Sequence, residues 1–138
     1  MIQSNFAPDH LYKDVTTRDH KRTPNCDVYI AGFPCQPFST AGKQQGFSDT
    51  KGRGTVFFDI LQYITTKRPK VFILENVKGL VTTQNGAYLN AILHELQSIG
   101  LSNNSSMCAG NNTGAYHIYH QILDTKEAYH NPEPDGTV

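Results

Sequence analysis

The fold of this chain is decided by one stretch, Val28-Tyr29-Ile30-Ala31-Gly32-Phe33-Pro34-Cys35-Gln36-Pro37-Phe38-Ser39. The short apolar run at Asp27–Ala31 predicts a buried strand, which Gly32 ends. Two prolines then fix the backbone φ angle on either side of Cys35 and Gln36. A thiol is therefore expected on a stiff turn at the carboxyl end of a strand, where open α/β sheets bind ligands. This placement suits a nucleophile.

The segments that follow predict a parallel α/β sheet. Apolar residues recur at helical spacing over Thr55–Lys67 and again from Gly86 to a C′ glycine at Gly100. Between these helices, Val71–Leu74 is a continuous apolar run, typical of a strand covered on both faces. Tyr116–Leu123 alternates as a half-buried strand should. Strands that alternate with helices in this order predict a parallel sheet.

Three segments carry little regular pattern. The first 25 residues are polar and irregular, which predicts a surface connector. Residues 33–54 form a long glycine-rich loop, and loops of about twenty residues inside compact domains are usually functional. The last segment, residues 127–138, is expected to be a disordered tail.

Composition excludes several classes of protein. The chain has 138 residues, 38% of them hydrophobic, which fits one globular domain or part of one. It lacks an apolar run of the roughly 20 residues that a membrane helix needs, and its first residues do not resemble a signal peptide. No membrane partner is expected. We expect an intracellular location, the nucleus in a eukaryote or the cytoplasm in a bacterium.

Charge and cysteine content give no sign of a metal or of a nucleic-acid surface. The three cysteines form no C-x-x-C pair, so the sequence predicts neither a zinc site nor a disulfide framework, and no metal. Twelve basic residues balance twelve acidic ones. A nucleic-acid partner must therefore be argued from the site and not from net charge.

Two candidate catalytic groups follow the two central strands. Cys35 follows the first strand, and Glu75 follows the second. One right-handed crossover helix between parallel strands would bring their carboxyl ends into one crevice. The pair suggests a nucleophile with an acid partner. The residues alone leave two alternatives open, because a free cysteine is often a small buried hydrophobe and a carboxylate after a strand often caps the next element.

Four ordered motifs together resemble the core of the cytosine-C5 DNA methyltransferases. The motifs are Phe33-Pro34-Cys35-Gln36-Pro37-Phe38-Ser39, Gly42-Lys43-Gln44-Gln45-Gly46-Phe47, Arg53-Gly54-Thr55-Val56-Phe57-Phe58-Asp59-Ile60 and Glu75-Asn76-Val77-Lys78. The resemblance extends from about Asp14 to Gly100. It implies an α/β chain with an incomplete Rossmann-like methyltransferase fold and a mostly parallel sheet, in which residues 1–138 are a partial catalytic domain.

The resemblance also implies a reaction and a catalytic set of four residues, Cys35, Glu75, Asn76 and Pro34. Cys35 would add to C6 of a flipped-out cytosine, so that C5 can attack the methyl group of S-adenosyl-L-methionine. Glu75 would hold the cytosine ring at N3 and at the exocyclic amine. Asn76 would fix the loop that contains Pro34 and Cys35.

Binding residues are implied in the same way. The cofactor S-adenosyl-L-methionine would contact Asp14, Val15, Pro34 and Val56. The glycine-rich loop would close over double-stranded DNA, the implied partner. Candidate DNA contacts are Gln36, Ser39, Lys43 and Arg53.

Several parts of the family pattern have no counterpart in this sequence. Missing are the glycine-rich turn after the first strand, the arginine-bearing motif and the variable region that recognises the target. We therefore expect that the isolated chain neither binds the cofactor nor methylates DNA, and that a complementary methyltransferase fragment is a possible partner. The alternatives are a fragment of an RNA cytosine-C5 methyltransferase and a non-catalytic remnant.

Overall fold

The computed structural model describes residues 5, 7–37, 47, 52–100 and 114–123. Four predicted elements are confirmed close to their predicted bounds. The elements in chain order are β1 (Val28–Gly32), the 3₁₀ helix η2 (Arg53–Thr55), α2 (Val56–Lys67), β2 (Val71–Glu75), α3 (Gly79–Thr82), the 3₁₀ helix η3 (Thr83–Gly86) and α4 (Ala87–Ser98).

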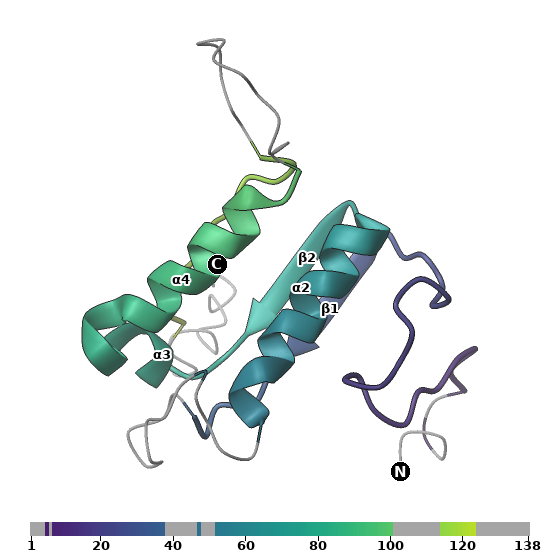
Figure 1. Ribbon diagram of the computed structural model, residues 1–138, viewed down its shortest axis with the longest axis horizontal. Coiled ribbons are helices and arrows are strands. Elements are labelled where there is room, and N and C mark those ends of the chain that lie inside the picture. The colour runs from purple at the N-terminus through teal and green to yellow at the C-terminus, as the bar shows by residue number, and fades with distance from the viewer. Residues whose placement is uncertain (1–4, 6, 38–46, 48–51, 101–113, 124–138) are drawn as a thin grey trace, which may run out of the picture.

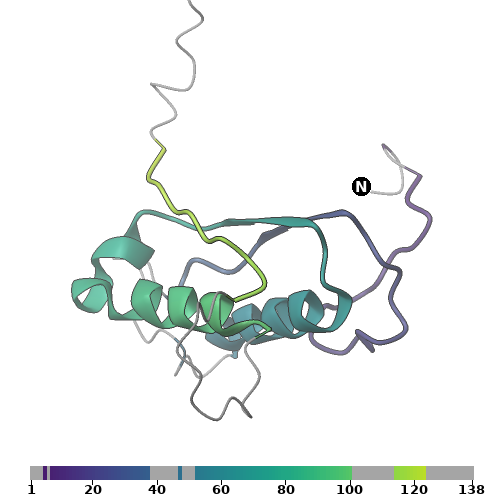
Figure 2. The same ribbon diagram turned by 90° about the horizontal axis from the view of Figure 1, so that it is seen from above.

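The two strands form a parallel pair, as the strand–helix–strand pattern predicted. The register runs from Val28 opposite Val71 to Gly32 opposite Glu75. Helix α2 is the crossover between them. Figures 1 and 2 show α2 and α4 on the same side of the two strands. The described chain is thus a helical layer packed on one face of a small sheet, an arrangement compatible with a partial methyltransferase fold.

The core lies between the strands and this helical layer. In α2, Phe57 and Ile64 are fully buried, because apolar side chains three and four positions apart share one face of a helix. The same spacing buries Ile92 and Leu96 in α4. The core cluster consists of Phe33, Phe57, Ile60, Ile64, Leu80, Ile92, Leu96 and Ile99.

Both long helices end where the sequence predicted. In α2, Arg68 adopts a left-handed conformation with φ 52°, its N–H donates to the Ile64 carbonyl at 2.9 Å, and Pro69 follows. After α4, Gly100 has φ 89°. A Cβ at Gly100 would lie 2.9 Å from both the Arg68 Nη1 and the Ala115 Cβ. Glycine is therefore required there for its conformation and for space.

One prediction about the sheet is wrong for the described residues. Val71–Leu74 was expected to be covered on both faces, but burial alternates along both strands. Side chains toward the helices, such as Phe72 and Leu74, are partly buried and pack on the core. Those on the other face are exposed by 53% at Val28, 69% at Ile30, 50% at Val71 and 53% at Ile73. All described helices lie on one side, so the opposite face stays open (Figure 2).

The strand predicted at Tyr116–Leu123 is also absent from the described structure. This segment runs from the end of α4 past β2 without joining the sheet (Figure 2). Tyr116 does pack on the core. Its ring contacts Phe72 edge to face, with 4.9 Å between the ring centroids, and its hydroxyl donates to the Pro69 carbonyl at 2.6 Å. Farther along, Tyr119 is 90% exposed. Alternating apolar residues form a strand only where a neighbour supplies hydrogen bonds, and none of the described strands does.

The N-terminal segment is anchored more firmly than a surface connector. His20 and Thr23 are buried, which the sequence did not predict. Tyr63 of α2 stacks on Tyr29 at 4.4 Å between ring centroids, and the Arg18 guanidinium lies 4.9 Å from the Tyr63 ring centroid. These contacts attach the segment to β1 and α2 through cation–π and stacking interactions.

The Tyr63 hydroxyl adds a second attachment of this segment. It donates to the Pro24 carbonyl at 2.9 Å and lies 3.3 Å from the Cys26 sulfur. Since the hydroxyl proton is used on Pro24, the Cys26 thiol is left to donate to the hydroxyl oxygen. Burial and the bond with Cys26 raise the pKa of Tyr63 to about 12. Tyr63 is therefore a neutral donor at physiological pH.

Two predictions lie wholly or largely outside the described residues. These are the disordered tail at residues 127–138 and most of the glycine-rich loop at residues 33–54. In contrast, the turn formed by α3 and η3 was not predicted, because the positive φ angles of 52° and 53° fall on Gln84 and Asn85, two non-glycine residues just before Gly86.

Candidate active site

The carboxyl ends of β1 and β2 meet at one edge of the sheet. Gly32 pairs with Glu75 there, and a Cβ at Gly32 would lie 3.2 Å from the Glu75 Oε2. The glycine leaves room for the carboxylate against the backbone that leads to Cys35. The sequence assigned Gly32 only the role of ending the strand. Its pairing with a carboxylate became visible only with the register.

The loop that carries Cys35 is held by buried residues on both sides. Phe33 is 6% exposed and packs on Phe57 with 5.8 Å between ring centroids. Pro37 is almost fully buried. Between them, Cys35 is a half-buried free thiol and Gln36 is exposed. The loop thus presents its thiol at the surface while both its ends are fixed.

Asn76 connects this loop to the end of β2. Its side-chain Nδ2 donates to the Phe33 carbonyl at 3.0 Å, and its Oδ1 accepts from the Val77 N–H at 2.9 Å. The Phe33 carbonyl belongs to the peptide bond that precedes Pro34. One amide side chain therefore cross-links the backbone segments that follow the two strands.

The fold brings the four predicted catalytic residues to one edge. Pro34 and Cys35 follow β1, while Glu75 ends β2 and Asn76 follows it. The parallel pairing on which their proximity depended is confirmed. Their individual roles in catalysis stay predictions.

The residues predicted to bind the cofactor supply one carboxylate and three partly buried apolar surfaces. Asp14 is exposed, and its Oδ1 accepts from both the N–H and the hydroxyl of Thr16 at 2.8 Å. These two bonds, the backbone one first, lower the pKa of Asp14. Val15, Pro34 and Val56 are half-buried. By residue type, a carboxylate can accept from the hydroxyl groups of a nucleoside and apolar side chains can pack on its base, so these four residues have the chemistry that one side of such a cofactor needs. Their joint role as a binding site stays a prediction.

The predicted DNA contacts are mostly not testable in the structure. Gln36 is exposed next to Cys35, where it is accessible. Ser39 and Lys43 lie outside the described residues, and so does the side chain of Arg53. The role of all four stays a prediction.

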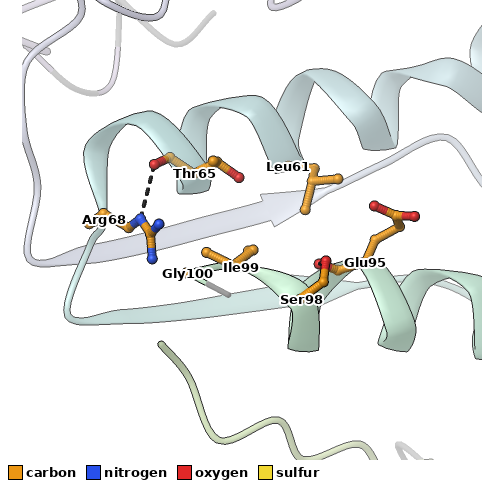
Figure 3. A pocket seen from close by; sticks show the side chains of 7 residues that line it. All are labelled: Leu61, Thr65, Arg68, Glu95, Ser98, Ile99 and Gly100. Atoms are coloured by element: carbon orange, nitrogen blue, oxygen red, sulfur yellow. Dashed lines mark hydrogen bonds between the residues drawn. The ribbon is translucent and has the colours of Figure 1, made fainter. Parts of the chain in front are cut away.

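A cavity of about 330 Å³ lies away from the predicted catalytic residues. It is formed by the last turns of α2 and α4, as Figure 3 shows. Arg68 lies at its edge, where its Nε donates to the Thr65 carbonyl at 3.0 Å. Because α2 runs from the carboxyl ends of the strands back to their amino ends, this cavity lies at the opposite edge of the sheet from Cys35. It is not part of the candidate active site.

The described part of the chain was also searched for other kinds of site. Within it, His, Cys, Asp and Glu side chains nowhere form a group of three that could bind a metal ion. Among the helices that the structure describes, none has the length and hydropathy needed to cross a membrane.

The chain matches known methyltransferases. Residues 1–124 match the family model of the C-5 cytosine-specific DNA methylases. The Type II methyltransferase M.NlaX of Neisseria lactamica is 46% identical over 125 residues, which are 91% of this chain and 34% of that protein. M1.ScrFI of Lactococcus lactis subsp. cremoris is 47% identical over 97 residues, 70% of this chain and 24% of that protein.

The extent of these matches settles the family. M.BanI of Aneurinibacillus aneurinilyticus is 54% identical over 77 residues, 56% of this chain and 18% of that protein. The chain thus spans about a third or less of the length of these relatives. The family model is that of DNA methylases, so the RNA alternative is not favoured. The chain belongs to the C-5 cytosine-specific DNA methylase family.

Proposed function

We propose that this chain supplies the catalytic centre of a DNA cytosine-C5 methyltransferase that uses S-adenosyl-L-methionine. The observation that carries the proposal is the hydrogen bond from Asn76 to the Phe33 carbonyl at 3.0 Å. It joins the loop of the nucleophile to the end of the strand that carries the acid, within the region that matches the family. In this proposal the parallel pair is the centre of a larger Rossmann-like sheet.

Cys35 acts as the nucleophile on a cytosine that is flipped out of the duplex, because neither C5 nor C6 can be reached in stacked DNA. Its thiolate forms a bond to C6, and the electron pair of the C5–C6 double bond makes C5 nucleophilic. The bound cofactor supplies an electrophilic methyl group to C5. A base, for which a water molecule is sufficient, then takes the proton from C5, the electron pair of that C–H bond re-forms the C5–C6 double bond, and the C6–S bond breaks to release the Cys35 thiolate.

Glu75 and Asn76 position the reacting groups. The Glu75 carboxyl group binds N3 and the exocyclic amine of cytosine and stabilises the charge that develops as Cys35 adds. Asn76 holds the Phe33 carbonyl and with it the start of the Cys35 loop. Fixed geometry of this kind lowers the entropic cost of reaching the reactive arrangement.

Binding of cofactor and DNA is assigned to neighbouring residues. Asp14, with its carboxylate already oriented by Thr16, binds the nucleoside part of the cofactor together with Val15, Pro34 and Val56. Gln36, Ser39, Lys43 and Arg53 contact double-stranded DNA. The protein therefore acts inside the cell, where its DNA is. Activity requires the rest of the methylase domain, since the chain spans only 34% of M.NlaX.

A chimera tests the proposed function. The segment of M.NlaX that aligns with this chain is replaced by residues 1–124, and methyl transfer from labelled cofactor is measured on duplex DNA and on transfer RNA. We expect transfer to DNA alone. The variant Cys35→Ser should lose at least about 10³-fold in rate, since the covalent route is closed.

The matched control is Cys26→Ser, because Cys26 is also a half-buried free cysteine but contacts Tyr63. It should retain activity. A folded chimera that methylates neither substrate would favour the non-catalytic remnant. Transfer to RNA, or equal loss in both cysteine variants, would contradict the proposed reaction.

A further inference from the structure

One aromatic side chain of the glycine-rich loop packs on both long helices. The half-buried ring of Phe47 lies 5.2 Å from the ring of Phe58 and 6.3 Å from that of Phe57, measured between centroids. Phe57 and Phe58 belong to the first turn of α2. On its other side, Phe47 meets Tyr88 of the first turn of α4 edge to face, with 5.4 Å between the centroids. All three distances are typical of favourable aromatic pairs.

The loop of Cys35 rests on one of the same rings. Phe33, two residues before Cys35, packs on Phe57 with 5.8 Å between ring centroids. Phe57 is fully buried in the core, at 0% exposure. Phe47 and the start of the Cys35 loop therefore share one support. This shared ring fixes where the two lie relative to one another.

Phe47 lies at the edge of the sheet that carries the candidate active site. Both long helices run back from the carboxyl ends of the strands toward their amino ends (Figure 1). Their first turns, where Phe47 packs, are therefore at the edge where Cys35 and Glu75 follow the strands. The contact lies at the opposite end of the helices from the cavity in Figure 3.

Two of the predicted DNA contacts flank Phe47 in the sequence. Lys43 stands four residues before it and Arg53 six residues after it. The far end of the loop is fixed by Thr55, whose N–H and hydroxyl both donate to the Gly52 carbonyl, at 3.3 Å and 2.6 Å. Between the buried Pro37 and Gly52, Phe47 is thus an additional point at which the chain is attached to the core.

We propose that Phe47 is a positioning residue for the DNA substrate. It ties the segment that carries Lys43 and Arg53 to the ring that also supports the Cys35 loop. A chain segment that becomes ordered only on binding loses conformational freedom, and that loss reduces the binding free energy. A contact that orders the segment beforehand removes part of this cost. The inference rests on the proposed function in that DNA is the substrate.

The contacts predict a separation of two kinetic constants. The Cys35 loop is held by Phe33, Pro37 and the Asn76 bond to the Phe33 carbonyl, none of which needs Phe47. Removing the Phe47 ring should therefore leave the methyl transfer step nearly unchanged. It should weaken the binding of DNA, because the loop must then be ordered at the expense of binding energy.

The first test uses the chimera of M.NlaX that carries residues 1–124 of this chain, with duplex DNA and labelled cofactor. We expect Phe47→Ala to raise the KM for DNA by about tenfold, with kcat and the KM for the cofactor changed by no more than about threefold. Phe47→Met keeps the apolar volume and can contact aromatic rings through its sulfur, so it should restore most of the DNA affinity. The control is Tyr119→Ala, at a 90% exposed ring, which should have no effect.

The second test needs neither DNA nor cofactor. The full 138-residue chain is digested with trypsin, and cleavage after Lys43 and Lys51 is followed by mass spectrometry. We expect Phe47→Ala to raise these rates by about threefold or more, because cleavage follows local opening of the chain. Cleavage after Lys70, which precedes β2, reports global unfolding and should stay unchanged. If Phe47→Ala unfolds the chain, Tyr88→Ala removes one of the partner rings instead and should give the same pattern in both tests.

The two tests separate this inference from the proposed function. An active chimera in which Phe47→Ala leaves the KM for DNA unchanged overturns the inference and leaves the proposed function intact. So does a lowered KM, which would mean that the contact opposes DNA binding. Unchanged cleavage after Lys43 and Lys51 overturns it as well. An inactive parent chimera contradicts the proposed function, whereas faster cleavage in Phe47→Ala would still support Phe47 as the attachment of the loop.

Discussion

The two faces of the sheet differ in burial, although both consist mainly of apolar residues from the same two strands. On the helical side, partly buried side chains pack against the core, namely Tyr29, Ala31, Phe72 and Leu74. On the opposite face, which we call the open face, the side chains are at least half exposed, namely Val28, Ile30, Val71 and Ile73. Both sets are apolar and alternate along the same ten residues. An apolar residue in a strand thus indicates that its face of the sheet can be covered. Whether that face is covered depends on the neighbouring elements.

The largest change in the free energy of unfolding is expected in the core, on the helix-covered face of the sheet. Phe57→Ala removes a fully buried ring from the core and should lower the free energy of unfolding by about 3–5 kcal/mol. Urea denaturation followed by circular dichroism measures this loss. The matched control is Phe58→Ala, since Phe58 is 42% exposed in the same helix and should lose far less. Equal losses would mean that the two faces do not differ in packing.

A smaller loss in the free energy of unfolding is expected at the edge of the sheet where the two strands end. Asn76→Asp keeps an acceptor for the Val77 N–H, but it removes the donor to the Phe33 carbonyl and sets a carboxylate against it. We expect a loss of about 1–2 kcal/mol and faster amide hydrogen exchange in residues 33–37. The control is Asn90→Asp on an exposed position of α4. Unchanged exchange would show that Asn76 does not hold the loop.

The contacts that attach the N-terminal segment to β1 and α2 should weaken in acid, because they include His20. Burial, and then the neighbouring Arg18 cation, lower the pKa of His20 below 6.5, while Asp59 and Asp19 act in the opposite direction. The Arg18 Nε also donates to the His20 Nδ1 at 3.3 Å, a bond that requires this nitrogen to be unprotonated. A lowered pKa in the folded state means that the unfolded state binds the proton first. The stability from neutral His20 is therefore complete above pH 6.5 and is lost as pH falls through the lowered pKa.

Comparison with His20→Asn isolates this contribution of His20. The asparagine amide cannot be protonated and its oxygen can still accept from Arg18. We expect the free energy of unfolding of the parent chain to fall more steeply between about pH 7 and about pH 5 than that of the variant. His94→Asn, at an 81% exposed side chain, should leave the slope unchanged. Parallel curves for the parent chain and His20→Asn would contradict the expectation.

The smallest effect is expected on the open face. In the isolated chain, Ile73→Thr should change the free energy of unfolding by no more than about 0.5 kcal/mol, because the side chain is 53% exposed and threonine also favours strands. Leu74→Thr is the control, one residue on and packed against the core, and should lose at least about 1 kcal/mol. Thermal denaturation measures both. A large loss at Ile73 would show that the isolated chain already covers this face.

The sequence predicted the bounds of the helices better than the pairing of the strands and the burial of their faces. The apolar spacing of α2 and α4 and the glycine after α4 are local features, and the structure confirms them. The strand expected at Tyr116–Leu123 is wrong because pairing requires a neighbour with free backbone groups, and alternation cannot show one. Burial of His20 was missed since it depends on Tyr63, which lies 43 residues away in α2.

For the candidate site, the sequence by itself determined the chemical groups and their order, and through the family motifs it determined the proposed reaction. The crossover pattern also predicted that Cys35 and Glu75 follow parallel strands, because chain direction is a local property. Only the tertiary structure decided that Gly32 makes room for Glu75, that Asn76 binds the Phe33 carbonyl, and that one face of the sheet remains open. These depend on strand register and on which elements lie nearby, and both are set by contacts between residues far apart in the chain.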